Sequence, residues 1–505
     1  MSDFLHTPAT KAGNMNSGST IPERFLRVAD ALASKVAVSD NEKQMLYGEL
    51  LSASIAMSGR IGDMTERPNV GIMLPNCAGF APAFFGTILS GKTAVPVNYL
   101  LNPRETGRII ADAGLDTVLT TGLFTDALEG LVPNVVKMEE VSFNESPSGF
   151  TPPRVRPDDV AALLYTSGTI YRPKGVMQTH KNILSNIDAC LRAMRISEDD
   201  VFLAVLPGFH TFGLTCAILL PLLTGGRVHF IARFAPAAVM RALRESGSTI
   251  FMGVPSMYKA LLKSISDGDS ATVPLPSLRL CVSGGEALPV ETGREFQRKT
   301  GVPLIEGYGM TETSPVIALN RPDRQKWGTA GLPLDNLEVG TFDDDGNRLP
   351  PGGDGELWVR GPSVMKGYRN LPEETAEILT DDGWLKTGDM CVIDEDGFIK
   401  ITGRKKEMII SAGKNIYPVE IERTLEEHAQ VFEAAVIGVA DEVRGEVPMA
   451  FVVPMPGTDL DRASLTAFCR EKLSAFKVPK KIQVVKEMPH TLTGKVLKRE
   501  LRPEA

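Results

Sequence analysis

The 505-residue chain lacks closely spaced cysteines and histidines. Its six cysteines are scattered without a Cys-x-x-Cys pair, and its six histidines do not share metal-ligand spacing. Close Cys and His spacing is typical of zinc sites and of small disulfide-linked domains. We therefore expect reduced thiols in a cytoplasmic protein, with neither a zinc site nor a disulfide framework.

Basic charge and long apolar runs are also scarce. The chain has 54 Lys and Arg against 62 Asp and Glu, a net charge of −8. A dedicated nucleic-acid binder needs a basic face, so this class is disfavoured. The longest apolar run, residues 214–223, contains Thr, Cys and Pro and is too short to span a bilayer. We expect no transmembrane segment, whereas peripheral membrane contact stays open.

The N-terminus has no apolar core behind basic residues, as an ordinary signal peptide would. Residues 1–20 are instead polar and contain Gly, Ser and Asn, which predicts a disordered tail.

The length exceeds what one hydrophobic core supports, and the 43% hydrophobic content is typical of a globular protein. Up to about residue 330, strand-length apolar runs alternate with helix-length segments, which predicts α/β layers with mainly parallel sheets. The strand candidates include 117–119, 161–165, 201–205, 228–231, 249–252, 278–283 and 303–306.

The sequence pattern changes after Gly331 to short β-type runs separated by Gly, Pro and Asp turns. We expect an α/β fold with a large N-terminal domain of layered sheets over 21–404, its β-rich subdomain lying at about 331–404. Residues 405–505 hold two helical and two strand patterns, which predict a small, mobile α+β C-terminal domain.

A hydroxyl-rich stretch follows the predicted strand 161–165. It reads TSGTIYRPKG over residues 166–175, and helical spacing begins at Asn182. A strand, a small-residue loop and a helix together can hold a phosphate through backbone N–H groups, hydroxyls and a lysine. An ordinary turn between a strand and a helix has a similar composition, so both interpretations stay open on this stretch alone. It is not a Walker loop, because no Gly-Lys-Ser/Thr closes it.

Several further motifs follow in a fixed order. They are YTSGT (165–169) with PKG (173–175), LPGFH (206–210), SGGE (283–286), GYGMTET (307–313), GEL (355–357), WLKTGD (384–389), GR (403–404), SAGKNIYP (411–418) and GK (494–495). Together they resemble the adenylate-forming superfamily of acyl-CoA synthetases, peptide-synthetase adenylation domains and luciferases, over residues 22–502. The run EGYGMTETSPV (306–316) and the compact length most resemble fatty acyl-CoA or acyl-carrier-protein synthetases.

The resemblance implies that a carboxylate reacts with ATP to give acyl-AMP, and that a thiol then displaces AMP. It implies ATP, Mg²⁺ and coenzyme A (or a carrier-protein phosphopantetheine) as partners, with Glu312 as the metal ligand. Lys495, Thr311, Glu312 and His210 are the expected catalytic residues. The expected ATP and AMP contacts are Thr166, Ser167, Gly168, Thr169, Lys174, Gly284, Gly285, Glu286, Gly307, Tyr308, Gly309, Thr311, Asp389 and Arg404.

The resemblance also divides the two half-reactions between two domain orientations. Lys495 would stabilise charge during adenylation and then leave, by rotation about a hinge at Lys406. Ser411, Ala412 and Gly413 would then face the pantetheine. The expected acyl wall is Phe209, His210, Gly213, Val254, Pro255, Thr313 and Val316, with His210 as a gate.

Each of these residues also has an ordinary structural interpretation on its own. Glu312 could be a helix N-cap or a surface carboxylate, Gly284 and Gly285 a turn, and Tyr308 a core aromatic. Asp389 could be a turn residue and Lys495 a surface lysine.

One position departs from the family pattern. Ile170-Tyr171 replaces a small or polar residue followed by Gly, so the loop has another path or handles ATP less well.

We expect an AMP-forming ligase that joins a medium- or long-chain fatty acid to coenzyme A. The alternatives are an acyl-carrier-protein or aryl-acid ligase, and a catalytically weak nucleotide-binding protein. The acid's chain length and the oligomeric state are not determined by the sequence.

Overall fold

The computed structural model describes residues 19–141, 150–166, 173–265, 274–412, 414–490 and 496–503, and the structural statements below refer to these residues. The chain forms two compact units. Unit 1 comprises Met1–Glu338 and Arg360–Leu385, and unit 2 comprises Val339–Val359 and Lys386–Ala505. Part of the expected β-rich subdomain is thus grouped with the C-terminal residues. The expected boundary and hinge at residues 404–406 remain predictions.

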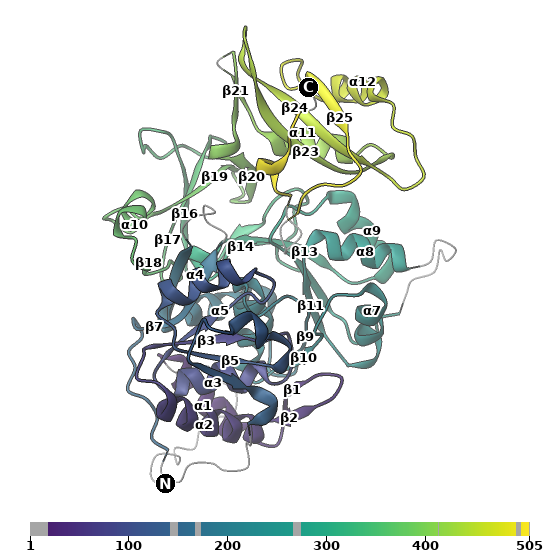
Figure 1. The fold of residues 1–505 in the computed structure, drawn as a ribbon. Coiled ribbons are helices and arrows are strands. Elements are labelled where there is room, and N and C mark those ends of the chain that lie inside the picture. Colours follow the sequence, from purple (N-terminus) through teal and green to yellow (C-terminus); the bar gives the residue numbers. More distant parts are fainter. Residues whose placement is uncertain are drawn as a thin grey trace. The chain divides into compact units, whose positions relative to one another are not determined.

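Unit 1 contains a seven-stranded sheet in the order β18-β8-β7-β4-β3-β5-β6 (Figure 1). Its strands are β3 (Asn69–Met73), β4 (Thr93–Pro96), β5 (Thr117–Thr120), β6 (Asn134–Lys137), β7 (Val160–Thr166), β8 (Lys174–Thr179) and β18 (Gly367–Tyr368). β3 to β7 pair in parallel, and β8 pairs antiparallel with both β7 and β18.

The second sheet of unit 1 has nine strands in the order β15-β14-β13-β12-β11-β9-β10-β1-β2. They are β1 (Val36–Ser39), β2 (Gln44–Leu46), β9 (Val201–Ala204), β10 (Arg227–Phe230), β11 (Ile250–Gly253), β12 (Leu280–Ser283), β13 (Leu304–Gly309), β14 (Val316–Leu319) and β15 (Leu332–Pro333). The strands from β1 to β13 in this order are parallel. Each of the seven strand candidates named above overlaps a strand, so the prediction of parallel α/β layers is confirmed.

Helices pack around the two sheets of unit 1. They are α1 (Ile21–Ala31), α2 (Tyr47–Met64), α3 (Phe80–Leu89), α4 (Pro103–Ala113), α5 (His180–Met194), α6 (Leu220–Leu222), α7 (Pro236–Glu245), α8 (Pro255–Ser264), α9 (Val290–Thr300) and α10 (Pro372–Ile378), with a π-helix η4 (Phe212–Leu219). All ten residues of α3 are buried, as its apolar sequence requires. α3 packs against α1 and α2 within the main core of the unit.

The segment after the hydroxyl-rich loop differs from the sequence prediction. We expected the loop to lead directly into a helix, but residues 174–179 form strand β8, which folds back antiparallel onto β7. α5 begins only at His180, where the Thr179 hydroxyl accepts from Asn182 N–H and caps the helix. The predicted phosphate loop therefore joins the two strands of a hairpin.

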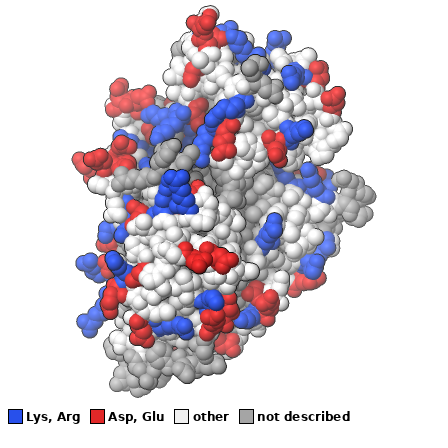
Figure 2. Space-filling view, in the orientation of Figure 1, with Lys and Arg blue, Asp and Glu red and all other residues white. Residues whose placement is uncertain are grey.

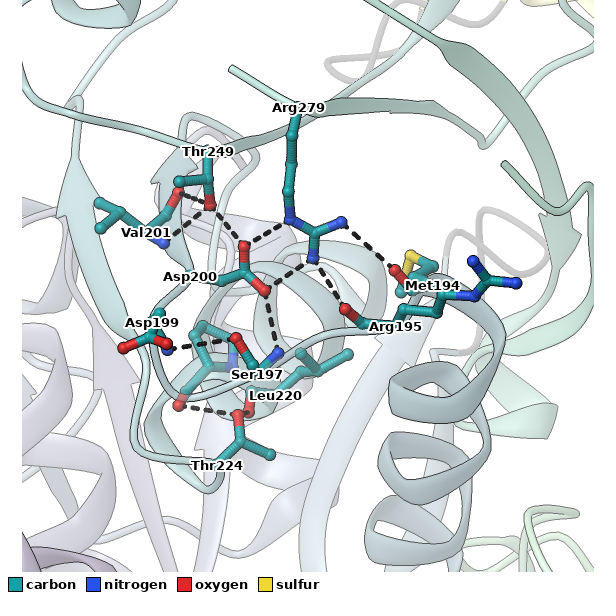
Figure 3. Close-up of polar contacts among 11 residues, drawn as sticks. Met194, Arg195, Ser197, Asp199, Asp200, Val201, Leu220, Thr224, Thr249 and Arg279 are labelled. Atoms are coloured by element: carbon teal, nitrogen blue, oxygen red, sulfur yellow. Dashed lines mark hydrogen bonds and ion pairs between the residues drawn. The ribbon is translucent and has the colours of Figure 1, made fainter. Parts of the chain in front are cut away.

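An ion pair between exposed Arg279 and buried Asp200 joins the amino ends of three parallel strands (Figure 3). Asp200, only 4% exposed, lies directly before β9 and accepts from Arg279 Nε and Nη2 at 2.7 Å each. Thr249, directly before β11, donates to the same carboxylate at 2.7 Å. Because these groups lie at the amino ends of the strands, they leave the carboxyl ends available for a site.

Unit 2 combines most of a four-stranded sheet with a five-stranded sheet. The first contains β16 (Glu338–Phe342), β17 (Asp354–Arg360), β19 (Leu385–Ile393) and β20 (Ile399–Arg404). The second contains β21 (Ile409–Ser411), β22 (Lys414–Ile416), β23 (Val431–Asp441), β24 (Gly445–Pro454) and β25 (Lys481–Val484), with helices α11 (Pro418–Glu426) and α12 (Arg462–Lys472). Ile421, Leu425, Val436 and Leu465 belong to a core of this α+β part, which confirms its expected class.

The surface carries both signs of charge. Figure 2 shows Lys and Arg side chains intermingled with Asp and Glu on the face that it presents, in keeping with the net charge of −8. Within the described ranges, no helix is both long and apolar enough to span a membrane.

Candidate active site

Two glycine-containing segments meet where β12 and β13 end. Ser283, the last residue of β12, pairs with Glu306 in the parallel ladder, so Gly284 after β12 lies beside Gly307 within β13. A Cβ atom on Gly284 would lie 3.4 Å from the carbonyl oxygen of Gly307 and 3.2 Å from the Phe212 ring. Gly285 has a φ of +86°, a conformation that favours glycine. The structure thus brings the Gly284 and Gly307 backbones together, and the Phe212 ring and the Leu319 side chain leave little room for a Cβ atom at either position.

Tyr308 and Gly309 complete β13, and both are half-buried. Tyr308 pairs with Ala318 of β14, and a Cβ on Gly309 would lie 2.1 Å from the Pro315 carbonyl oxygen. Only a residue without a side chain fits at Gly309. Glu286 follows Gly285 directly, so the predicted adenine-binding residues share one edge of the sheet.

Glu312 lies in a short 3-10 helix, η5 (Thr311–Thr313), directly after β13. Its side chain is buried, and its Oε1 accepts from the Tyr368 hydroxyl at 2.6 Å. Met365 N–H also donates to the Glu312 carbonyl at 2.8 Å. Glu312 is therefore neither a helix N-cap nor a surface carboxylate, which excludes both ordinary interpretations. Burial and the adjacent Glu312 charge raise the pKa of Tyr368, so its hydroxyl remains a donor.

Lys174, the first residue of β8, belongs to the same group of side chains. Its Nζ lies 4.8 Å from the centroid of the Tyr368 ring. Thr166, the last residue of β7, pairs with Lys174 across the hairpin. The structure thus unites Lys174, Tyr368 and Glu312, whereas the predicted contacts Ser167, Gly168 and Thr169, together with Ile170 and Tyr171, lie outside the described residues.

Gln178 is a site-forming residue that our sequence analysis missed. It is fully buried on β8, and its Nε2 donates to the Thr311 carbonyl at 2.7 Å and to Thr211 Oγ1 at 3.3 Å. It thereby joins three segments: β8, the loop after β9 and η5. Its spacing of four residues from Lys174 in a strand, which puts both side chains on one face, could have indicated it.

The predicted acyl wall begins in the loop after β9. The Phe209 ring is buried and meets Tyr99 edge-on, with ring centroids 5.2 Å apart. Asn76, also missed by the sequence analysis, donates to the Leu206 carbonyl at 2.9 Å, and its Oδ1 accepts from Gly208 N–H at 3.2 Å. Asn76 thus fixes the backbone that carries Phe209.

His210 lies half-buried next to Phe209. Its Nδ1 accepts from Phe212 N–H at 3.3 Å, and burial lowers its pKa. The side chain is therefore neutral near pH 7. A Cβ on Gly213 would lie 2.2 Å from the Pro207 carbonyl oxygen, so the turn into η4 requires glycine there.

The remaining wall candidates come from two other segments. Val254 and Pro255 follow β11, and Val254 Cγ1 would lie 3.6 Å from a Cβ on Gly285, at the predicted adenine site. Thr313 is fully buried, and its hydroxyl bonds backbone carbonyls, including that of Pro315 at 2.5 Å. Asn186 Nδ2 donates to the Val316 carbonyl at 2.8 Å, which joins α5 to β14.

Unit 2 carries the remaining candidates. Asp389 on β19 and Arg404 on β20 are cross-strand partners, and Arg404 Nε lies 2.7 Å from Asp389 Oδ1. Asp389 is thus a buried, paired strand residue and not a plain turn residue. Ser411 is buried at the end of β21, and Ala412 has a φ of +47° and donates to the Arg444 carbonyl. Gly413 and Lys495 lie outside the described residues.

Comparison with protein families shows which family the chain belongs to. The family model described as AMP-binding enzyme matches residues 25–369, and that of the AMP-binding enzyme C-terminal domain matches residues 420–495. The chain belongs to the AMP-binding enzyme family. This confirms the resemblance to the adenylate-forming superfamily, and the enzyme is an AMP-forming acid–thiol ligase.

Relatives of this ligase match along most of its length. It is 33% identical to the long-chain-fatty-acid–CoA ligase of Bacillus subtilis (strain 168), an alignment that covers 93% of this chain and 92% of that protein. It is 35% identical to the feruloyl-CoA synthase of Amycolatopsis sp, with 92% and 95% covered. The solved structure of the anthranilate CoA ligase AuaEII in complex with anthranoyl-AMP has a TM-score of 0.88 at 29% identity, with 95% of this chain and 96% of that chain covered.

ATP with Mg²⁺, and coenzyme A as the thiol substrate, are the reactants of this AMP-binding enzyme. The residues present fit Mg²⁺, because Glu312 is a buried carboxylate and a hard cation prefers oxygen ligands. The described part of the chain holds no group of three or more His, Cys, Asp or Glu side chains that could bind a metal unaided. Mg²⁺ would therefore share the nucleotide phosphates and water with Glu312.

Proposed function

We propose that this ligase activates a medium- or long-chain fatty acid as its acyl-AMP and transfers the acyl group to coenzyme A. The observation that carries the choice of acid is the charge of the wall. Phe209 and Val254 are apolar, and His210 is neutral because burial lowers its pKa. A buried wall without charge disfavours an amino acid or a dicarboxylic acid, whose second charge would stay unpaired. The long-chain-fatty-acid–CoA ligase relatives support the same class of acid.

The roles of the ATP-site residues follow from the charges they bring together. Lys174 would bind the β- and γ-phosphates, with the hydroxyls of Thr166, Ser167 and Thr169. Glu312 would bind Mg²⁺ and Thr311 the α-phosphate. Bringing a carboxylate against a phosphate requires that negative charge be neutralised, so preorganised positive charge at Lys174 and Lys495 would dominate the rate of adenylation. Adenine would lie against Gly284 and Gly307 beside Tyr308, and Asp389 would accept from the ribose hydroxyls.

The contacts on either side of Lys406 support a hinge there. Lys405 Nζ lies 3.1 Å from Oε2 of Glu356, which belongs to β17 of the four-stranded sheet. Glu407 Oε2 lies 2.8 Å from Nζ of Lys498, near the C-terminus. Lys406 is exposed between these two differently anchored neighbours, so a change in its backbone angles would separate them.

The test is carboxylate-dependent ATP–pyrophosphate exchange over a panel of acids. We expect saturated fatty acids of medium or long chain to have the highest kcat/KM, with aryl acids, amino acids and dicarboxylic acids well below. Glu312→Gln, purified in parallel, should lose the exchange and thereby report any contaminating ligase. Preference for a charged side chain in the acid would contradict the proposal.

A second acid class has specific support. The feruloyl-CoA synthase relative and the anthranilate CoA ligase structure favour an aryl acid, which an aromatic wall at Phe209 and Tyr99 would also accept. An aryl acid with the highest kcat/KM would establish this alternative. Thioester formation measured with coenzyme A and, separately, with a phosphopantetheinylated carrier protein decides the acceptor. We also propose a cytoplasmic location, because all six cysteines are free thiols.

A further inference from the structure

Tyr368 contacts both Glu312 and Lys174. Its hydroxyl donates to Glu312 Oε1 at 2.6 Å, and its ring lies under Lys174 Nζ at 4.8 Å from the centroid. It is 8% exposed. Because it lies 56 positions from Glu312, this contact depends entirely on the fold.

The backbone around Tyr368 is fixed to the same two segments. Tyr368 pairs with Val176 across β18 and β8, and Arg369 N–H donates to the Gly175 carbonyl at 2.8 Å. Tyr368 N–H donates to Thr375 Oγ1 at 3.0 Å. The ring therefore has little freedom to leave the space between Lys174 and Glu312.

We propose that Tyr368 is a positioning residue for adenylation, whose hydroxyl orients the Glu312 carboxylate toward Mg²⁺ and whose ring face holds the Lys174 ammonium toward the phosphates. The proposal rests on the roles given to Glu312 and Lys174 in the proposed function. A carboxylate has two oxygens, and the hydroxyl occupies Oε1. Oε2 would then be left to bind the metal ion. The ring offers its negative face to Lys174 and so holds the lysine ammonium in place without neutralising its charge.

Two substitutions separate these two actions. Tyr368→Phe removes the hydroxyl and keeps the ring, so only the metal-dependent part of ATP binding should suffer. Tyr368→Leu removes both, so ATP binding without metal should weaken as well. Tyr47→Phe is the matched control: Tyr47 is fully buried, and its hydroxyl donates to a backbone carbonyl, that of Gly226, also at 2.6 Å.

The experiment is isothermal titration of the whole protein with ATP, in excess EDTA and in excess Mg²⁺. For the native chain, Mg²⁺ should tighten ATP binding. In Tyr368→Phe we expect this gain to shrink about tenfold with Kd in EDTA unchanged, since a hydrogen bond to a charged group is lost. In Tyr368→Leu, Kd in EDTA should rise severalfold as well. Tyr47→Phe should keep both native Kd values, even where its melting temperature falls.

An unchanged Mg²⁺ gain in Tyr368→Phe would overturn the proposal, and so would equal weakening of ATP binding in EDTA and in Mg²⁺. Acid-dependent pyrophosphate exchange by the native chain is measured alongside. If the native chain catalyses exchange and Tyr368→Phe keeps the native Mg²⁺ gain in ATP affinity, only the positioning role is contradicted. Absence of native exchange, or of any native Mg²⁺ gain, sinks the proposed function itself. The KM for the acid should stay unchanged in Tyr368→Phe.

Discussion

Arg404 Nε lies 2.7 Å from Oδ1 of its cross-strand partner Asp389, whose side chain is 4% exposed. The guanidinium holds the buried carboxylate in place as a hydrogen-bond acceptor. This pair suits the recognition of the two ribose hydroxyls that we assign to Asp389.

The first prediction concerns Asp389→Asn. It should raise the KM for ATP about tenfold, because one acceptor and its charge are lost, and should leave the KM for the acid unchanged. Steady-state exchange with ATP and with 2′-deoxy-ATP measures the effect. The native chain should discriminate against the deoxynucleotide, and the variant should discriminate less. Equal discrimination in both proteins would show that Asp389 does not contact the ribose.

The second prediction concerns the hinge. Lys406→Pro fixes φ at a residue whose backbone must rotate, so acyl-AMP formation should continue while thioester formation falls strongly. Pyrophosphate exchange and thioester release, measured on the same preparation, separate the two steps. Lys406→Ala is the control, because it removes the side chain but keeps backbone freedom. A normal overall rate in the proline variant would move the hinge elsewhere.

The third prediction concerns Lys495, which is assigned from the sequence. Lys495→Ala should slow acyl-AMP formation by roughly 10²-fold or more, the scale of losing one preorganised donor. Thioester formation from supplied acyl-AMP should stay near the native rate. Lys486→Ala removes an exposed lysine of the same unit and should change neither step. Equal losses in both half-reactions of Lys495→Ala would contradict a role confined to adenylation.

The fourth prediction concerns stability and pH. His180 is 3% exposed, and its Nδ1 accepts from Ile21 N–H. Burial lowers its pKa to about 4, although Asp159 and Glu23 oppose the shift. The unfolded chain, with a His pKa near ~6.5, therefore binds the proton first as the pH falls. The free energy of unfolding should decrease between about pH 6.5 and pH 4, by up to roughly 3 kcal/mol.

Urea unfolding midpoints between pH 7 and pH 4.5 measure this dependence. His180→Asn keeps an acceptor for Ile21 N–H but has no group that titrates, so its midpoint should vary less with pH. The same slope in both proteins would assign the pH dependence to other groups.

The sequence predicted the elements whose own pattern determines them. The mainly apolar segment Phe80–Leu89, whose pattern predicts a helix, forms the buried helix α3 over the same residues, because it has no polar face to expose. β8 was missed because it is short, contains Gly175 and has charged and polar residues at both ends. A hairpin partner supplies its hydrogen bonds, and no local pattern signals that partner.

In the candidate site, too, residues within a local motif were predicted, and residues that join distant segments were missed. Motif spacing predicted Gly284, Gly307 and Glu312, which the structure brings to one edge of the sheet or directly after it. The residues that hold the site together, Gln178 and Tyr368, act on segments 133 and 56 positions away. Such contacts depend on how the sheets are assembled, which a single sequence does not display.

Adenylation of the acid transfers a carboxylate oxygen to the α-phosphorus of ATP. The direct test supplies a fatty acid labelled with ¹⁸O in both carboxylate oxygens, together with ATP, Mg²⁺ and coenzyme A, and analyses the products by mass spectrometry. The carboxylate displaces pyrophosphate and keeps its oxygen on phosphorus, and the thiol then breaks the bond between that oxygen and the acyl carbon. We predict one ¹⁸O in each AMP, none in pyrophosphate, and one AMP per acyl-CoA. Unlabelled AMP, or ADP and labelled orthophosphate in its place, would contradict the account.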